Sequence, residues 1–534
     1  MAMHATPGET MTSPAETAAQ PPAQPPAAQS RSAFVRAFNR VFSRHLMSCA
    51  MLVLVLFLMA GNIRSPGNIL HDPDLWWHMA DARILATTHH FIRMEPYSFS
   101  VAGKPWVNPE WLSEEPFWLG YKLFGFSGIY LATLLALCGN IVFLYWRGVW
   151  RSRHAGAAFW AAAIGISLMI VNAGPRTIVI AYLAMSAEMA VLEAAARGRT
   201  RLLWLLPPLF LVWINLHGSW IIGLGLFVLY ILSGLFEFNK GVFEQPAFSP
   251  QVRKQLLFVL LACIAVLIVN PYGWRLVWNP IDMMLNQKLN IQNVQEWQPL
   301  NLAWFVGKGA LAIIFLTVIA NALHGRKWKV FDLAVVLFAW YAAFAHARFA
   351  FMAAILTVPI LAIDFENAFC TESDEKTIPV MNMVMVLATL GTVAYFYPSS
   401  AKMDKEFHRV FPLDTIASIQ PSWRTLNNDG LGGIMDWEHR SPFIDSRDDT
   451  FEHHGVLKDY LDIIRMQDTF ALMDKYHIDH ALLQRGDALS YLLEHAPGWT
   501  LVRSEGPSDG GYLLFQHTPG SPPGASLIPQ PAKH

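Results

Sequence analysis

Long apolar blocks separated by short polar segments dominate the first three quarters of the chain. About eleven blocks of roughly 16–21 residues are present, and each is long enough to cross about 30 Å of hydrocarbon as a helix. They cover residues 45–61, 127–146, 155–172, 177–195, 202–216, 218–236, 255–270, 309–323, 331–345, 349–365 and 379–397. The block at 202–216 is short, so a partial span is the alternative there. The pattern predicts an α-helical polytopic membrane protein.

From about residue 404 the apolar runs become shorter and their periodicity changes. Strand-like runs cover residues 432–437, 442–445, 479–484, 500–504 and 512–516. Helix-like runs cover residues 456–466 and 488–495. Together they predict a small α/β domain of about 110 residues, which is large enough for its own core. The Gly-Leu-Gly-Gly run at 430–433 is predicted to be a turn before a strand, not a dinucleotide fingerprint.

Composition agrees with a membrane protein and excludes some other classes. Hydrophobic residues make up 54% of the chain and charged residues 15%, whereas a soluble protein is about one quarter charged. The net charge of −1 gives no argument for nucleic-acid binding. Cys49, Cys138 and Cys263 fall in predicted spans and Cys370 in a predicted inner loop. A disulfide framework is therefore not expected.

Basic residues set the orientation and the domain boundaries. Arginines at 31, 36, 40 and 44 precede the first span, and basic clusters recur near residues 147–153, 197–201 and 326–329. The positive-inside rule places these segments in the cytoplasm. The resulting organisation is a disordered cytoplasmic tail at 1–44, a transmembrane core at 45–397 with outer loops at 62–126 and 271–305, an extracytoplasmic domain at 398–518, and a flexible tail at 519–534.

Two carboxylates stand one residue apart at the start of the first outer loop, in Asp72-Pro73-Asp74. Such a pair can bind a divalent cation, Mg²⁺ or Mn²⁺, or take a proton from a hydroxyl group. The structural alternative is that Asp74 caps a short interfacial helix beginning at Leu75. His71 and His78 flank the pair, and each is either a ligand or a solvated interfacial histidine.

The run from Pro105 to Glu115 adds more polar candidates to the same loop. Glu110 and Glu114 are one helical turn apart, so both side chains can point into one cavity. Trp106 can bury against lipid or stack on a sugar face. The alternative is a second interfacial helix with acidic surface residues.

Four further ionisable residues are predicted near the outer ends of the spans: Arg176, His217, Glu296 and Arg348. Ionisable groups at such positions are costly and usually functional. Arginine suits phosphate because its guanidinium offers paired donors. Carboxylates and arginines together at the lipid boundary are what a polyprenyl-phosphate-linked donor requires. Snorkelling or capping is the alternative for each residue alone.

The chain also resembles a known superfamily in several motifs. These are Asp72-Pro73-Asp74-Leu75-Trp76-Trp77-His78, Pro105-Trp106, Glu110-Trp111-Leu112, Trp213-Ile214-Asn215-Leu216-His217-Gly218, Asn270-Pro271-Tyr272-Gly273, Glu296-Trp297 and Phe443-Ile444-Asp445-Ser446-Arg447. They are similar to motifs of bacterial polytopic membrane proteins that resemble the GT-C superfamily of glycosyltransferases. The resemblance implies a lipid-phosphate sugar donor and an acidic motif that falls on Asp72 and Asp74.

These observations predict a GT-C-like bacterial inner-membrane protein with a C-terminal extracytoplasmic α/β domain. It would transfer a sugar from a polyprenyl-phosphate carrier to a glycan, lipid or protein acceptor on the outer face. The predicted catalytic residues are Asp72, Asp74 and Glu110, and Asp72 and Asp74 are also the candidate metal ligands. The predicted substrate-binding residues are His78, Trp106, Glu114, Arg176, His217, Glu296 and Arg348. The alternatives are a transporter or flippase of lipid-linked glycans and a non-catalytic envelope-assembly protein.

Overall fold

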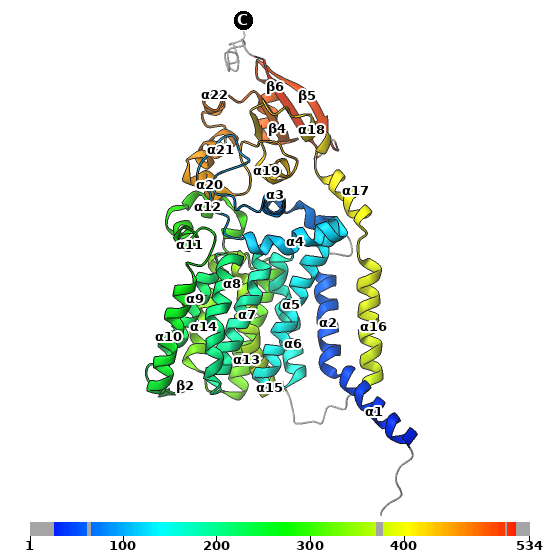
Figure 1. The fold of residues 1–534 in the computed structure, drawn as a ribbon, viewed down its shortest axis with the longest axis vertical. Helices are drawn as coiled ribbons and strands as arrows, with labels where there is room; N and C mark the ends of the chain where they lie inside the picture. The colour runs from blue at the N-terminus through cyan, green and yellow to red at the C-terminus, as the bar shows by residue number, and fades with distance from the viewer. Residues whose placement is uncertain (1–25, 61–65, 370–377, 508–509, 519–534) are drawn as a thin grey trace, which may run out of the picture.

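The fold is described from a computed structural model, which describes residues 26–60, 66–369, 378–507 and 510–518. Long, roughly parallel helices form a bundle at one end, and a smaller domain caps the other end (Figure 1). Between these two parts, helices α3 and α4 lie across the ends of the bundle (Figure 1). Cys370 and most of the predicted inner loop around it lie outside the described residues.

Every apolar block predicted as a span overlaps an α-helix over most of its length. These helices are α2 (Arg44–Met59), α5 (Phe126–Ser152), α6 (Ala155–Met169), α7 (Thr177–Ala196), α8 (Leu206–Leu216), α9 (Trp220–Ser233), α10 (Pro250–Val266), α13 (Phe305–His324), α14 (Val330–Ala345), α15 (Ala350–Phe369) and α16 (Pro379–Phe396). Within the described residues, seven helical segments are long and apolar enough to cross a membrane, and three apolar ones are shorter. The chain is a multi-pass membrane protein, and its exact number of spans stays a prediction.

Helix α15 lies at the centre of the bundle. Its residues from Ala350 to Ala362 are almost all completely buried, so the helix is apolar on every side. The predicted inner basic cluster is also partly internal. Arg147 is 1% exposed and donates to Glu193 at 2.7 Å, and Arg151 donates to Asp332 at 2.6 Å. Arg147 therefore belongs to the bundle, not to an exposed cytoplasmic connection.

Short elements complete the membrane half. They are α1 (Pro26–Val41), η1 (Pro66–His71), α3 (Pro73–Thr88), α4 (Trp111–Phe124), η2 (Ile170–Asn172), η3 (Thr200–Leu205), β1 (Phe238–Lys240), β2 (Phe243–Gln245), α11 (Trp274–Asn286), α12 (Lys288–Asn293), η4 (Gln295–Trp297) and η5 (Ala347–Phe349).

Helix α3 differs from its prediction in two ways. Its N-cap is Asp72, whose Oδ1 accepts the Asp74 N–H at 3.1 Å, so the helix begins at Pro73 and Asp74 is not the cap. The prediction failed because proline is favoured at the first helical position. The helix is also not interfacial, because every residue from Leu75 to Ala82 is buried. The C-terminal domain covers the side that an interfacial helix would expose.

The C-terminal domain is built on a four-stranded sheet of order β3-β4-β6-β5. Strand β3 is parallel to β4, and the other pairs are antiparallel, with Leu426 opposite Ala481 and Leu483 opposite Leu513. The elements are α17 (Ser400–Val410), α18 (Leu413–Ser418), β3 (Thr425–Asn427), α19 (Asp429–Trp437), α20 (Asp448–His453), α21 (Val456–Ile464), α22 (Thr469–Lys475), β4 (His480–Gln484), α23 (Ala488–His495), β5 (Trp499–Glu505) and β6 (Tyr512–His517). The domain boundaries at 398 and 518 stay a prediction.

Two predicted strands are wrong. Residues 432–437 lie in helix α19, which Asn428 caps by accepting the Gly430 N–H at 3.1 Å, and residues 442–445 have no regular structure. The glycines allow close packing instead of a turn. A Cβ on Gly432 would lie 2.3 Å from the Asp445 Cα, and one on Gly433 would lie 2.5 Å from the Pro73 carbonyl oxygen. Thus Gly433 lets α19 pack directly on α3.

Candidate functional site

Three segments that are distant in sequence meet at the guanidinium of Arg176. Its Nε donates to Asp72 Oδ2 at 2.7 Å, and its Nη1 donates to Glu296. Asp72 precedes α3, Arg176 precedes α7, and Glu296 lies in η4. We call these three residues the Arg176 cluster. The Arg176 and Glu296 side chains are 22% and 28% exposed, so the cluster borders an accessible surface.

Burial and charge act against each other in this cluster. Burial raises the pKa of Asp72, while the Arg176 charge lowers it. Burial lowers the pKa of Arg176, but the charges of Asp72 and Glu296 outweigh this and leave it above its ordinary value. Arg176 therefore stays cationic at any physiological pH.

Glu110, at the N-terminus of α4, lies at the centre of a second group of contacts. Its Oε1 is 3.2 Å from His217 Nε2, its Oε2 is 3.4 Å from His78 Nε2, and the Thr177 hydroxyl donates to Oε2. The Ser219 N–H donates to His217 Nδ1 at 2.9 Å. His217 therefore carries its proton on Nε2 and donates it to Glu110.

The protonation tendencies of this group favour acid–base chemistry. Burial raises the pKa of Glu110 above its ordinary value. Burial, followed by the charge of Arg348, lowers the pKa of His217 to about 3, so its ring is neutral. A carboxylate whose pKa lies closer to neutrality is better matched to taking a proton from a hydroxyl group. Glu110 has this property and is 19% exposed.

Arg348 supplies a second cation. Its guanidinium lies 4.2 Å from the centre of the Trp297 ring, and Trp297 follows Glu296. The charge of Arg348 also lowers the pKa of both Glu110 and His217, so it acts on the Glu110 group. Two arginines thus flank the Glu296-Trp297 dipeptide beside buried carboxylates. Such an arrangement can bind a phosphate group.

Asp74 projects from the first turn of α3. Its Oδ1 lies 3.5 Å from Trp77 Nε1, and its side chain is half-buried. The Asp74 charge raises the pKa of Asp72, Glu110 and Asp448. Asp74 therefore lies between the membrane half and helix α20 of the C-terminal domain.

Three of the predicted residues lie deeper than expected. His78 is buried, and its Nδ1 is 2.8 Å from Glu114 Oε1, so it is not a solvated interfacial histidine. Glu114 is 1% exposed. Trp106 does not join these groups, because its ring packs 4.8 Å from the Arg447 guanidinium. His71, in contrast, is exposed, which agrees with the alternative that it is a solvated histidine.

The donors of Asp72 and Asp74 do not fit a divalent cation in this arrangement. Oδ1 of Asp72 accepts the Asp74 N–H, and Oδ2 accepts the Arg176 guanidinium, which places a fixed cation beside the pair. Among the described residues, no group of three His, Cys, Asp or Glu side chains has the arrangement that holds a metal ion.

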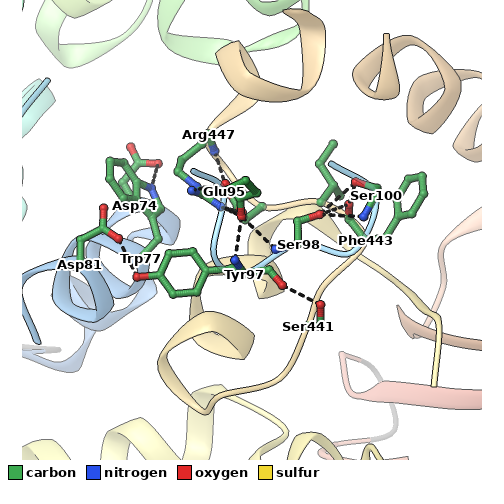
Figure 2. A network of polar contacts seen from close by, with 12 residues as sticks. Asp74, Trp77, Asp81, Glu95, Tyr97, Ser98, Ser100, Ser441, Phe443 and Arg447 are labelled. Atoms are coloured by element: carbon green, nitrogen blue, oxygen red, sulfur yellow. Dashed lines mark hydrogen bonds and ion pairs between the residues drawn. The ribbon is translucent and has the colours of Figure 1, made fainter. Parts of the chain in front are cut away.

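One polar cluster was not predicted (Figure 2). Arg447 donates to both oxygens of Glu95 at 2.8 and 2.9 Å and to both oxygens of Asp445 at 2.9 and 2.6 Å. All three side chains are 0–1% exposed. We call them the Arg447 cluster. Asp445 and Arg447 belong to the Phe443–Arg447 motif, which suggested a family but no role. Glu95 belongs to no motif and stands 352 residues before Arg447.

More bonds join the same two segments. The hydroxyls of Ser98 and Ser100 donate to the Phe443 carbonyl oxygen at 3.0 and 2.6 Å, and the Ser441 hydroxyl donates to the Tyr97 carbonyl oxygen at 2.6 Å (Figure 2). The segment between α3 and α4 and the C-terminal domain are therefore held together by several hydrogen bonds.

A cavity of about 340 Å³ lies elsewhere, between α4, α5 and α17. It is lined by Tyr121, Gly125, Phe126, Ser400, Ala401 and Asp404. None of the predicted site residues borders it.

The sequence matches no protein-family model, and no curated protein matches it. Solved structures are similar in fold. The oligosaccharyltransferase AglB of Archaeoglobus fulgidus, in complex with an inhibitory peptide and a dolichol-phosphate, is 11% identical with a TM-score of 0.50, over 91% of this chain and 75% of that one. ArnT of Cupriavidus metallidurans bound to undecaprenyl phosphate is 14% identical with a TM-score of 0.47, over 92% of this chain and 99% of that one.

A third structure, the Archaeoglobus fulgidus oligosaccharyltransferase in complex with Zn and sulfate, is 12% identical with a TM-score of 0.39, over 88% of this chain and 73% of that one. The similarity to AglB confirms that this chain has a fold like that of the GT-C glycosyltransferases, as its sequence motifs implied.

Proposed function

We propose that this protein is a glycosyltransferase of the bacterial inner membrane. It moves a sugar from a polyprenyl-phosphate-linked donor to an acceptor on the outer face. The observation that carries this proposal is the placement of Arg176 and Arg348 beside Asp74 and Glu110 at the ends of the spans. The GT-C-like fold supports it, and AglB, which shares that fold, is bound to a dolichol-phosphate.

The arginines hold the donor phosphate. Nη2 of Arg176 makes no hydrogen bond to any residue that the structure describes, whereas Nε and Nη1 are occupied. Glu296 is the more exposed of its two partners, and a phosphate that takes its place gains the same charge-assisted bond. Asp72 remains as the counter-ion that orients the guanidinium. Arg348 contributes its charge from the other side of Trp297.

The carboxylates activate the acceptor. Glu110 takes the proton of the acceptor hydroxyl as the acceptor oxygen forms its bond to the sugar C1. The bond from C1 to the donor phosphate oxygen breaks, and the arginines hold the charge on the departing phosphate. Asp74 aligns the acceptor from α3, and the Nε2 proton of His217 keeps Glu110 oriented.

The requirement for a divalent cation is tested separately. Mg²⁺ or Mn²⁺ would have to displace Arg176 from Asp72 to be shared with Asp74. Activity in the presence of a chelator, followed by addition of each metal, tests it. Full activity after chelation rejects the cation, and loss restored by one metal supports it.

Orientation is tested by labelling. The proposal places Arg199 and Lys327 in the cytoplasm and Asp74 and the C-terminal domain outside. Arg147 and Asp445 are buried, so a labelling reagent could not reach cysteines introduced at these two positions. Cysteines introduced at the exposed Lys327 and Lys458 suit the experiment. A membrane-impermeant reagent applied from outside should label only position 458, and labelling at 327 contradicts the topology.

The decisive experiment is glycan analysis of a deletion strain. Loss of a transferase leaves the lipid-linked donor in place and removes the glycosylated product. Wild-type protein should restore the product, and the Glu110→Gln variant should not. A flippase would instead leave its substrate in the inner leaflet, and Glu188 in α7 is the residue to test, because its buried carboxylate has no hydrogen-bond partner among the described residues. Full restoration by Glu110→Gln would support an assembly protein.

A further inference from the structure

A continuous series of polar contacts runs inward from Glu110. Oε2 of Glu110 is 3.4 Å from His78 Nε2, and His78 Nδ1 is 2.8 Å from Glu114 Oε1. Beyond Glu114, the Asn108 amide donates to Glu114 at 2.8 Å and to Asp81 at 3.0 Å. The Tyr97 hydroxyl then donates to the other oxygen of Asp81 at 2.6 Å (Figure 2).

Exposure falls sharply along this series. The side chain of Glu110 is 19% exposed, that of His78 is 6% and that of Glu114 is 1%. Only Glu110 can therefore touch a substrate. His78 and Glu114 are two titratable groups, in direct contact, that the transfer reaction itself does not use.

A small cavity lies at the end of this series that is farthest from Glu110. It measures about 10 Å³ and is lined by Asp81, Leu85, Phe91, Ile92, Asn108, Trp111, Glu114 and Tyr272. This volume is close to the minimum for one water molecule, and the polar groups on its wall can bind one. Leu85, Phe91 and Ile92 are only half-buried, so the cavity lies close to the outer surface.

We propose that His78 and Glu114 form an exit route for the proton that Glu110 takes from the acceptor. This inference rests on the proposed function. Glu110 gives its proton to His78 Nε2, and His78 Nδ1 gives its own proton to Glu114 Oε1. Glu114 is protonated at rest, so it releases its own proton from Oε2 to a water in the small cavity as Oε1 takes the proton from His78. A tautomer change then returns His78 to its first state. Substrate covering Glu110 closes the direct path to solvent, so an internal path is required during turnover.

Electrostatics agree with this direction of transfer. Burial lowers the pKa of His78, so the ring passes a proton on instead of keeping it. Burial raises the pKa of Glu114 well above its ordinary value, so it holds a proton readily. The charged and titratable groups that act on the two residues are Asp72, Asp74, Asp81, Glu110, Glu115, Arg176, Tyr272 and Arg447.

The competing explanation is that Glu114 only orients His78. Glu114→Gln separates the two, because the Gln oxygen still accepts from His78 and Asn108 but cannot take a proton. Glu115→Gln is the matched control, since Glu115 is the next residue of α4 and is half-buried. His78→Asn is the second variant. It keeps a donor near Nδ1 and removes the contact with Glu110.

Rates are measured in inner-membrane vesicles as formation of the glycan that the deletion strain lacks. A proton route predicts about 100-fold lower kcat for Glu114→Gln and His78→Asn, with unchanged KM for the lipid-linked donor and an altered pH profile. Glu115→Gln should match the wild type. A Glu114→Gln protein with wild-type kcat at every pH overturns the inference. If that variant does not fold, His78→Asn decides in the same way.

Infrared spectroscopy of the full chain in nanodiscs tests the route without an assay of transfer. The carbonyl band of protonated Glu114, assigned by its loss in Glu114→Gln, should be present at neutral pH and should shift promptly on transfer to D₂O. A missing band, or one that does not exchange, overturns the route whatever the deletion strain shows. If the band exchanges but the deletion strain lacks no glycan, the result would support the route and reject the proposed transferase.

Discussion

Two clusters in this molecule hold an arginine between two carboxylates, and they differ in burial. In the Arg447 cluster the side chains are 0–1% exposed and four bonds join the guanidinium to Glu95 and Asp445. In the Arg176 cluster, Arg176 and Glu296 are 22% and 28% exposed, and two bonds join the guanidinium to its partners. The chemistry is the same, but only the second arginine can exchange a partner.

The surroundings strengthen this difference. The Arg447 guanidinium lies 4.8 Å from the Trp106 ring, 5.1 Å from the Tyr97 ring and 6.0 Å from the Trp77 ring. Aromatic faces and four bonds leave it no room for a ligand. A fully paired buried arginine holds two domains together, and a partly paired arginine at a surface can bind a substrate. The comparison therefore separates structural from candidate functional residues.

The largest expected effect comes from removing the buried arginine. Arg447→Ala leaves Glu95 and Asp445 buried without their cation and should lower the free energy of unfolding by about 3–5 kcal/mol. Thermal unfolding in detergent measures it. Arg176→Ala is the matched control and should unfold within about 1 kcal/mol of the wild type, because its pairs are partly exposed. Equal losses in both variants would remove the distinction between the clusters.

The next effect is on activity. Asp74→Asn and Glu110→Gln should each lower the transfer rate by about 100–10,000-fold with a melting temperature near that of the wild type. Helix α3 should persist in Asp74→Asn because Asp72 is its cap. Because burial raises the pKa of Glu110, wild-type activity should fall as pH decreases through that pKa. A folded Asp74→Asn protein with full activity would assign Asp74 a structural role.

A smaller effect is expected on ligand binding. Glu296→Gln removes the charge that competes with a phosphate for Arg176, so it should bind undecaprenyl phosphate about tenfold more tightly, since a charged hydrogen bond contributes about 1.5–3 kcal/mol. Arg348→Ala should bind it more weakly. Calorimetric titration in detergent measures both. Unchanged affinity in Glu296→Gln would show that phosphate does not take the place of Glu296.

The smallest effect concerns Asp436, beside the Arg447 cluster. Asp436 is 1% exposed, and neither carboxylate oxygen has a hydrogen-bond partner among the described residues. Burial raises its pKa well above the ordinary value. The folded state thus keeps a proton that the unfolded state releases, and stability is lost as pH rises towards the folded pKa. Asp436→Asn should remove this loss, so its advantage in melting temperature should grow with pH. A constant difference would contradict it.

The sequence predicts most of the helices and strands whose residues follow a regular apolar period. The helices of the membrane half follow from apolar blocks, and β4, β5, β6, α21 and α23 follow from shorter periodic runs. The structure brings Glu110 to His217 and Asp72 to Arg176, whereas the prediction that these residues share one membrane face stays a prediction. The catalytic and binding roles of these residues stay predictions.

The failures have a common physical cause, which is tertiary contact. Helix α19 looked like a strand because its glycines suggest a turn, yet Gly432 and Gly433 permit contact with Asp445 and Pro73. His78 looked solvated because no local pattern reveals that Glu114 and the C-terminal domain enclose α3. The Arg447 cluster was missed because its pairing joins segments 352 residues apart. Local patterns carry no information at that distance.

The packing of Gly433 on Pro73 also bears on biogenesis. Helix α3 is synthesised early and α19 late, so the covering of α3 must wait until nearly the whole chain has been made. If the C-terminal domain lies outside, as we propose, it must also be translocated before the candidate site is complete. A chain interrupted before α19 would insert its spans with α3 uncovered. Export of the C-terminal domain, the last part to be made, would thus complete the candidate site in a newly synthesised molecule.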